Sequence, residues 1–183
     1  MYVETVVQDI ADVLKGIDSS GAPFKHFHPG VGPYGEPQLV KLVAERLNDI
    51  PRYGGCAKTM RSPDLLIAGH WALEIKIARP FGDNGKSAEN WSQNLLHPYS
   101  GNTSLLGDCL KLQAMARSEQ KAVVAIGYEH VSAEISLEPL WKAFEVVAAA
   151  VLNIQLGARA AAFRDALIHP VHQQLVVVGW EVG

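Results

Sequence analysis

The chain has 183 residues, of which 48% are hydrophobic and 19% are charged, and its formal net charge is -3. This length suits one domain, residues 1–183, with its own hydrophobic core, and a slightly acidic chain is not expected to coat nucleic acid non-specifically. The sequence contains no run of about 18 apolar residues that could span a bilayer. Its N-terminus is acidic and periodic, unlike a signal peptide, and Cys56 and Cys109 have no CxxC partner. We therefore expect a cytoplasmic protein with reduced thiols and no membrane partner.

Hydrophobic periodicity predicts two helices in the first third of the chain. Apolar residues recur every three or four positions in residues 1–17, and the same pattern begins again at Glu36 and continues to about residue 50. Residues 18–35 between them are rich in glycine and proline, as is typical of a loop. The pattern of residues 51–60 fits a short strand or a loop.

Strands and helices alternate through the rest of the chain. Two strand-like runs meet at Gly69 in "SPDLLIAGHWALEIKIARP", residues 62–80. The segments that follow are expected to be a polar connection at 81–103, a helix at 104–118, a strand at 121–130, helices at 137–156 and 158–169, and a strand at 173–182. This order predicts an α/β fold with a central mixed β-sheet flanked by helices on both faces. The polar connection is long, and we expect it to border a substrate groove.

Charged residues interrupt the two strand-like runs that meet at Gly69. If the turn centres there, Asp64 faces Glu74 across an antiparallel pair, with Cβ atoms about 5 Å apart, and Lys76 shares the face of Glu74. Two close carboxylates repel each other, and burying either one alone is costly. A divalent cation resolves both problems, because Mg²⁺ prefers carboxylate oxygens. A neighbouring lysine can then orient or deprotonate a metal-bound water, so the pattern predicts a metal site for phosphodiester hydrolysis.

These residues resemble the motif of the PD-(D/E)XK nuclease superfamily, which includes many restriction and repair nucleases. The match consists of Pro63-Asp64, nine intervening residues, and the run EIK at residues 74–76. The resemblance implies a restriction endonuclease-like core in residues 36–129, built from a helix, a sheet meander that carries the motif, a second helix and a further strand. The N-terminal helix and the C-terminal helix and strand would be additions to it. The resemblance also implies that Asp64 and Glu74 bind Mg²⁺ and that Lys76 assists the attacking water.

The resemblance also suggests residues around this centre. The family often adds a glutamate from the helix before the meander, and Glu36 lies on the same side of its helix as the apolar stripe, whereas Glu45 does not. We therefore expect Glu36 to be a further metal ligand, with Glu45 as the alternative. On the helix after the motif, Asp108 and Lys111 are three apart and share a face. The candidate substrate-binding residues are Lys111, Arg79, Lys86 and Gln113.

The sequence thus predicts a DNA endonuclease of restriction or repair type that depends on Mg²⁺, with Mn²⁺ able to replace it. A homodimer is a plausible assembly, because cutting both DNA strands requires two active sites. Two alternatives are a catalytically inactive binding or structural module of the same fold and an unrelated α/β protein, which opposite faces for Asp64 and Glu74 would indicate. In a purely structural interpretation, Glu74 and Lys76 lie on the solvated face of an edge strand. His26 and His28 have a spacing that suits Zn²⁺, but no cysteine or carboxylate cluster lies beside them in the sequence, so a loop role is preferred. The pattern does not separate DNA from RNA, or restriction from repair, defence or toxin roles.

Overall fold

A computed structural model of the chain describes residues 1–98, 104–131 and 135–183. Its centre is a six-stranded sheet in the order β1-β2-β3-β4-β6-β5. The strands are β1 (Ala57–Thr59), β2 (Leu65–Ile67), β3 (Trp71–Ala78), β4 (Gln120–Glu129), β5 (Ala160–Arg164) and β6 (Gln174–Glu181). β3 and β4 are parallel, whereas each of the other neighbouring pairs is antiparallel.

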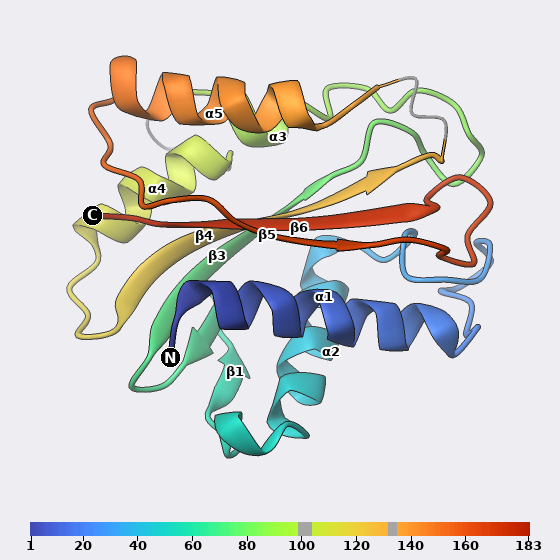
Figure 1. Cartoon of the computed structure of the whole chain (residues 1–183), viewed down its shortest axis with the longest axis horizontal. Coiled ribbons are helices and arrows are strands. Elements are labelled where there is room, and N and C mark those ends of the chain that lie inside the picture. Colours follow the sequence, from blue (N-terminus) through green and yellow to red (C-terminus); the bar gives the residue numbers. More distant parts are fainter. Residues whose placement is uncertain (99–103, 132–134) are drawn as a thin grey trace.

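Helices cover both faces of this sheet (Figure 1). α1 (Val3–Ser19) and α2 (Glu36–Asn48) pack on one face, and a short 3₁₀ turn, η1 (Pro51–Tyr53), follows α2. On the opposite face lie α3 (Gln93–Leu96), α4 (Leu105–Ala114) and α5 (Glu138–Ala150). The predicted α/β fold with a mixed sheet between two helical layers is therefore confirmed.

The central strand β3 is buried on both sides, and its side chains alternate between the two hydrophobic cores. Leu73, Ile75 and Ile77 belong to the core under α1 and α2. Ala72 and Ala78 belong to the core under α4 and α5. The even-numbered positions of β3, which include the two charged residues of the predicted motif, therefore face α4.

Most predicted segments have the expected type, but several are shorter. Residues 51–60 contain η1 and β1, and the polar connection 81–103 contains α3, although residues 99–103 of it lie outside the described residues. α4 ends at Ala114, because Met115 has an extended backbone conformation.

The predicted helix at residues 158–169 is wrong, because this segment contains strand β5. Ala160 and Ala162 are buried, whereas Ala161 and Phe163 are exposed, which is the two-residue period of a strand with one covered face. The alanines give the segment a high helix propensity, but propensity is a weak preference that pairing with β6 overrides.

Among the helices of the described residues, none combines the length and the apolar character that crossing a membrane requires.

Candidate active site at the β2–β3 hairpin

The β2–β3 hairpin has the register on which the predicted site depends. Leu65 pairs with Leu73, as expected for a turn centred on residue 69. Asp64 directly precedes β2 and therefore lies level with Glu74. Asp64 also accepts a hydrogen bond through Oδ2 from the backbone N–H of Ile75, at 2.9 Å. The predicted approach of the first acid to β3 is thus confirmed, and this hydrogen bond fixes the acid to the strand.

Lys76 joins β3 to the helices on both sides of the sheet. Its Nζ lies 3.1 Å from Glu36 Oε1 and 3.1 Å from Asp108 Oδ2. Glu36 begins α2 and Asp108 lies in the first turn of α4. The preference for Glu36 over Glu45 agrees with this arrangement, because Glu45 is exposed and pairs instead with Lys41 in the next turn of α2.

Glu74 is held from two directions. Lys111 Nζ lies 2.8 Å from Glu74 Oε2 and 3.0 Å from Asp108 Oδ1, so this lysine bridges the two acids. The hydroxyl of Ser62 donates to Glu74 Oε1 at 3.2 Å. The Glu74 side chain is only 1% exposed, whereas that of Lys111 is 42% exposed. Lys111 therefore reaches from the surface to a buried carboxylate.

We call these charged side chains the hairpin site. Its members are Glu36, Asp64, Glu74, Lys76, Asp108 and Lys111. The two ammonium groups balance only two of the four carboxylates, so the fully ionised site carries two excess negative charges.

The pKa values of the site reflect this imbalance. Burial, together with the neighbouring Asp64 and Asp108, raises the pKa of Glu74 to about 7, although the contact with Lys111 acts in the opposite direction. Burial also raises the pKa of Glu36 above its ordinary value, although Lys76 acts against this. Burial would lower the pKa of Lys76, but Glu36 and Asp108 raise it overall. Lys76 is therefore an ammonium ion, and Glu74 exchanges its proton in the neutral pH range.

Two hollows adjoin the hairpin site at Glu36. One, of about 410 Å³, is lined by Glu36 and Asp64 and has Lys41 and Arg61 beside them. The other, of about 220 Å³, is lined by Glu36 and by Trp91 and neighbouring residues of the polar connection. Water and small ions therefore have a path to this side of the site.

Three predicted substrate-binding residues do not contact the charged groups of the hairpin site. Arg79 is at an odd-numbered position after β3, so it points to the opposite side from Lys76, and its guanidinium donates to the carbonyls of Gly32 and Tyr34. Gln113 donates to the carbonyl of the C-terminal residue at 2.6 Å. Lys86 is exposed on the bend that follows β3. Of the four candidates, Lys111 contacts the carboxylates of the site, and Arg79 lines the smaller hollow beside Glu36.

The sequence offered Asp108 as a polar residue of the helix after the motif, but it was not among the predicted site residues, and Ser62 was not considered. Asp108 is 3% exposed and contacts both lysines, which makes it the most connected acid of the hairpin site. The three-residue spacing to Lys111 was a signal that the two share a helix face. No local pattern indicated that Ser62 would donate to Glu74, since that contact depends on how the chain enters β2.

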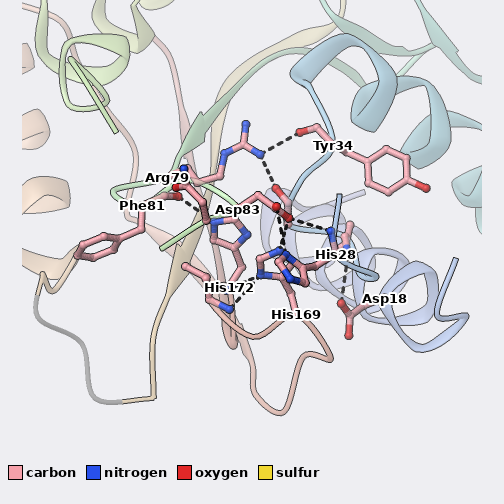
Figure 2. A network of polar contacts seen from close by, with 12 residues as sticks. Asp18, His28, Tyr34, Arg79, Phe81, Asp83, His169 and His172 are labelled. Atoms are coloured by element: carbon pink, nitrogen blue, oxygen red, sulfur yellow. Dashed lines mark hydrogen bonds and ion pairs between the residues drawn. The ribbon is translucent and has the colours of Figure 1, made fainter. Parts of the chain in front are cut away.

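A second cluster lies among the loops at the far end of β3, and we call it the loop cluster: His28, Asp83 and His169 (Figure 2). Each residue offers a ligand atom within 4.8 Å of the others, and in the part of the chain that the structure describes no comparable group of three forms at the hairpin site. Asp83 Oδ1 accepts from the His28 backbone N–H and from His169 Nε2, both at 2.9 Å. Asp83 Oδ2 accepts from His28 Nδ1 at 3.1 Å.

The hydrogen bonds of His169 decide how well the loop cluster suits a metal. Its Nδ1 accepts from the backbone N–H groups of Val171 and His172, at 3.1 and 3.0 Å. The neutral ring must therefore carry its proton on Nε2, which donates to Asp83. A metal at Nε2 would have to replace that proton, whereas a metal-bound histidine ordinarily donates through its other nitrogen. The ligand types of the loop cluster allow a metal, but its hydrogen bonds fit a role in holding three loops together.

Comparison of the chain with known protein families, curated proteins and solved structures gave no match. The chemistry and geometry of the two clusters are therefore the observations that bear on function.

Proposed function

We propose that the protein is a Mg²⁺-dependent DNA endonuclease with a restriction endonuclease-like fold. The observation that carries this proposal is the convergence of Asp64, Glu74 and Lys76 from adjoining strands. The flanking helices add Glu36 and Asp108, which hold the lysine in place.

The order of elements supports the fold assignment. From Glu36 to Glu129 the chain forms α2, η1, three antiparallel strands, the short α3, α4 and then β4, which is parallel to β3. This order agrees with the helix, meander, helix and strand order that the resemblance to the PD-(D/E)XK family implies, with the motif residues at the β2–β3 hairpin.

The charge of the hairpin site supports a divalent cation. The fully ionised site has two excess negative charges, and the pKa of Glu74 is raised to about 7. A divalent cation would stabilise the ionised carboxylates of such a site. Asp64 and Glu74 are the residues that would hold it, since Mg²⁺ is commonly bound by one or two carboxylates and several waters. When bound, the ion lowers the pKa of a water ligand and stabilises negative charge on the phosphate. Glu36 is paired with Lys76, so we assign it primarily to orienting that lysine.

The chain's own residues then serve the hydrolysis of a phosphodiester. Lys76 keeps its proton, because Glu36 and Asp108 raise its pKa, and it therefore donates a hydrogen bond instead of acting as a base. Its ammonium orients the attacking water and offsets charge on the phosphate. The water oxygen forms a bond to phosphorus and releases a proton to solvent, the P–O bond to the leaving alcohol breaks, and the leaving oxygen takes up a proton from solvent.

Plasmid cleavage in Mg²⁺ or Mn²⁺ tests this proposal. Asp64→Asn and Lys76→Met should each lower the rate roughly 10²- to 10⁴-fold, as expected for loss of a metal ligand or of a positioned donor. Glu45→Gln, on the exposed side of α2, is the matched control and should cleave like the wild type. Equal cleavage by the wild type and both site variants would refute the assignment, and so would a wild type that does not cut DNA in either metal.

A further inference from the structure

The side chain of Lys111 places its ammonium group between two buried acids, Glu74 and Asp108. Its Nζ lies within 3.0 Å of oxygens from both Glu74 and Asp108. No other described ammonium group contacts Glu74. The ion pair with Asp108 alone would be an ordinary helix pair of residues three apart, but the contact with Glu74 crosses from α4 to β3.

We propose that Lys111 is a built-in counter-ion of the hairpin site, which a divalent cation must displace in order to bind Glu74. The proposal rests on the proposed function, because it concerns the same metal. It adds a residue that controls the affinity for that metal and is not itself a ligand.

The two lysines of the site differ in a way that singles out Lys111. Lys76 is 10% exposed and is held by Glu36 and Asp108 from two different helices. Lys111 is 42% exposed, belongs to the surface of α4, and reaches the site through its flexible stem. Lys111 can therefore swing out to solvent by rotating side-chain bonds, whereas moving Lys76 would disturb β3 and both helices.

Displacement of Lys111 would leave the carboxylates arranged for a metal. Each oxygen of Asp108 is held by a different lysine, so Asp108 keeps its contact with Lys76 after Lys111 leaves. Glu74 keeps the hydrogen bond from Ser62 to Oε1, while Oε2 becomes free for a new cation. Replacing a single positive charge by a doubly charged ion reduces the negative excess of the site.

Calorimetric titration with Mn²⁺ in the absence of DNA tests the proposal through binding instead of activity. Lys111→Met removes the competitor and should tighten Mn²⁺ binding at least roughly tenfold, because the ion no longer has to break a hydrogen bond between charged groups. Lys111→Arg keeps the charge and should bind Mn²⁺ as weakly as the wild type. Lys41→Met removes a positive charge beside Asp64 that does not contact Glu74, and it should change the affinity by less than about threefold.

Thermal melting in a chelator provides the second measurement and shows whether the variants fold. Lys111→Met should melt below the wild type without metal and gain more from Mn²⁺ than the wild type does. Unchanged or weaker Mn²⁺ binding by Lys111→Met, with clear binding by the wild type, would overturn the role of Lys111 and leave the proposed metal site standing. Absence of Mn²⁺ binding in both proteins would overturn the two proposals together.

Discussion

The hairpin site and the loop cluster each gather residues that can bind metals, yet their chemistry differs. At the loop cluster one carboxylate, Asp83, receives three hydrogen bonds from two histidines. At the hairpin site four carboxylates share two lysines. The single carboxylate of the loop cluster is stabilised by three hydrogen bonds, whereas the hairpin site has four carboxylates and only two lysines. The types of ligand atom alone would make the loop cluster the better candidate for a metal site. The balance of hydrogen-bond donors and charges makes the hairpin site the better candidate.

Two carboxyl groups record this difference in opposite pKa shifts. Burial and acidic neighbours raise the pKa of Glu74 to about 7. Partial burial acts in the same direction on Asp83, but the hydrogen bonds from His169 and His28 outweigh it and lower the pKa of Asp83 to about 2. The two clusters thus differ in whether the surroundings favour the protonated acid, as at Glu74, or the carboxylate, as at Asp83.

The largest expected effect is on metal binding. Glu74→Gln should weaken Mn²⁺ binding at least about 100-fold, because loss of a ligand should cost no less than loss of an outer-shell partner. Asp83→Asn should leave the Mn²⁺ affinity unchanged, since the hydrogen bonds of the loop cluster do not favour a metal. Calorimetry on the two variants makes the comparison, and the reverse pattern would move the metal centre to the loop cluster.

The close packing around the loop cluster should make Gly32 hard to replace. A Cβ at this position would lie 2.6 Å from the Cβ of the buried His172. Gly32→Ala should therefore lower the free energy of unfolding by about 1–3 kcal/mol, the usual cost of overpacking. Gly16→Ala is the control, because no atom lies within 4 Å of its added Cβ, and it should be neutral or stabilising. Urea denaturation measures both, and a tolerated Gly32→Ala would mean that the loops are loosely held.

Asp83→Asn should also lower the free energy of unfolding, although it should not change the Mn²⁺ affinity. We expect a loss of about 1–3 kcal/mol in unfolding free energy, because the variant replaces hydrogen bonds to a charged acceptor by weaker ones. In the wild type this contribution is present above the ordinary pKa of Asp83, 3.8, and is lost as the pH falls through about 2. Urea denaturation at pH 7 and below pH 3 should show the two proteins converging in acid. A constant difference between them would argue against the loop cluster as a stabilising unit.

The smallest effect is the pH dependence of the metal-free hairpin site. The pKa of Glu74 is about 7 in the folded protein against 4.5 ordinarily, so folding favours the protonated acid. This contribution is complete below pH 4.5 and is lost as the pH rises through 7, which should lower the melting temperature by a few degrees between about pH 5.5 and 8.5. Glu74→Gln should reduce that decrease in a chelator. An equal decrease in both proteins would assign it to other groups.

Local rules predicted the centre of the hairpin site. The turn position and the alternation of side chains fixed Asp64 opposite Glu74, and they put Lys76 on the same face. The periodicity of one helix then distinguished Glu36 from Glu45. These inferences succeeded because they concern residues on one hairpin and one helix.

Contacts between distant segments were beyond such rules. The loop cluster joins residues 28, 83 and 169, which no spacing connects, and the contacts of Arg79 with the loop before α2 have no local signal. The sequence suggested that Asp108 shares a face with Lys111, but only the packing of α4 on β3 shows that it contacts Lys76. The strand at Ala160–Arg164 was missed because its alanines favour a helix until β6 pairs with them.

The alternation along β3 has a consequence for how this protein can change in evolution. Lys76 extends from one face of β3 into the hairpin site. Arg79, just past the end of the strand, extends from the other face and donates a hydrogen bond to the loop before α2. Inserting or deleting one residue between them would reverse the side on which one of the two emerges. A single substitution along this stretch affects the contacts of Lys76 or those of Arg79. A change in its length would disturb both sets of contacts at once. We therefore expect length variation among descendants of this chain to be confined to the loops around β3.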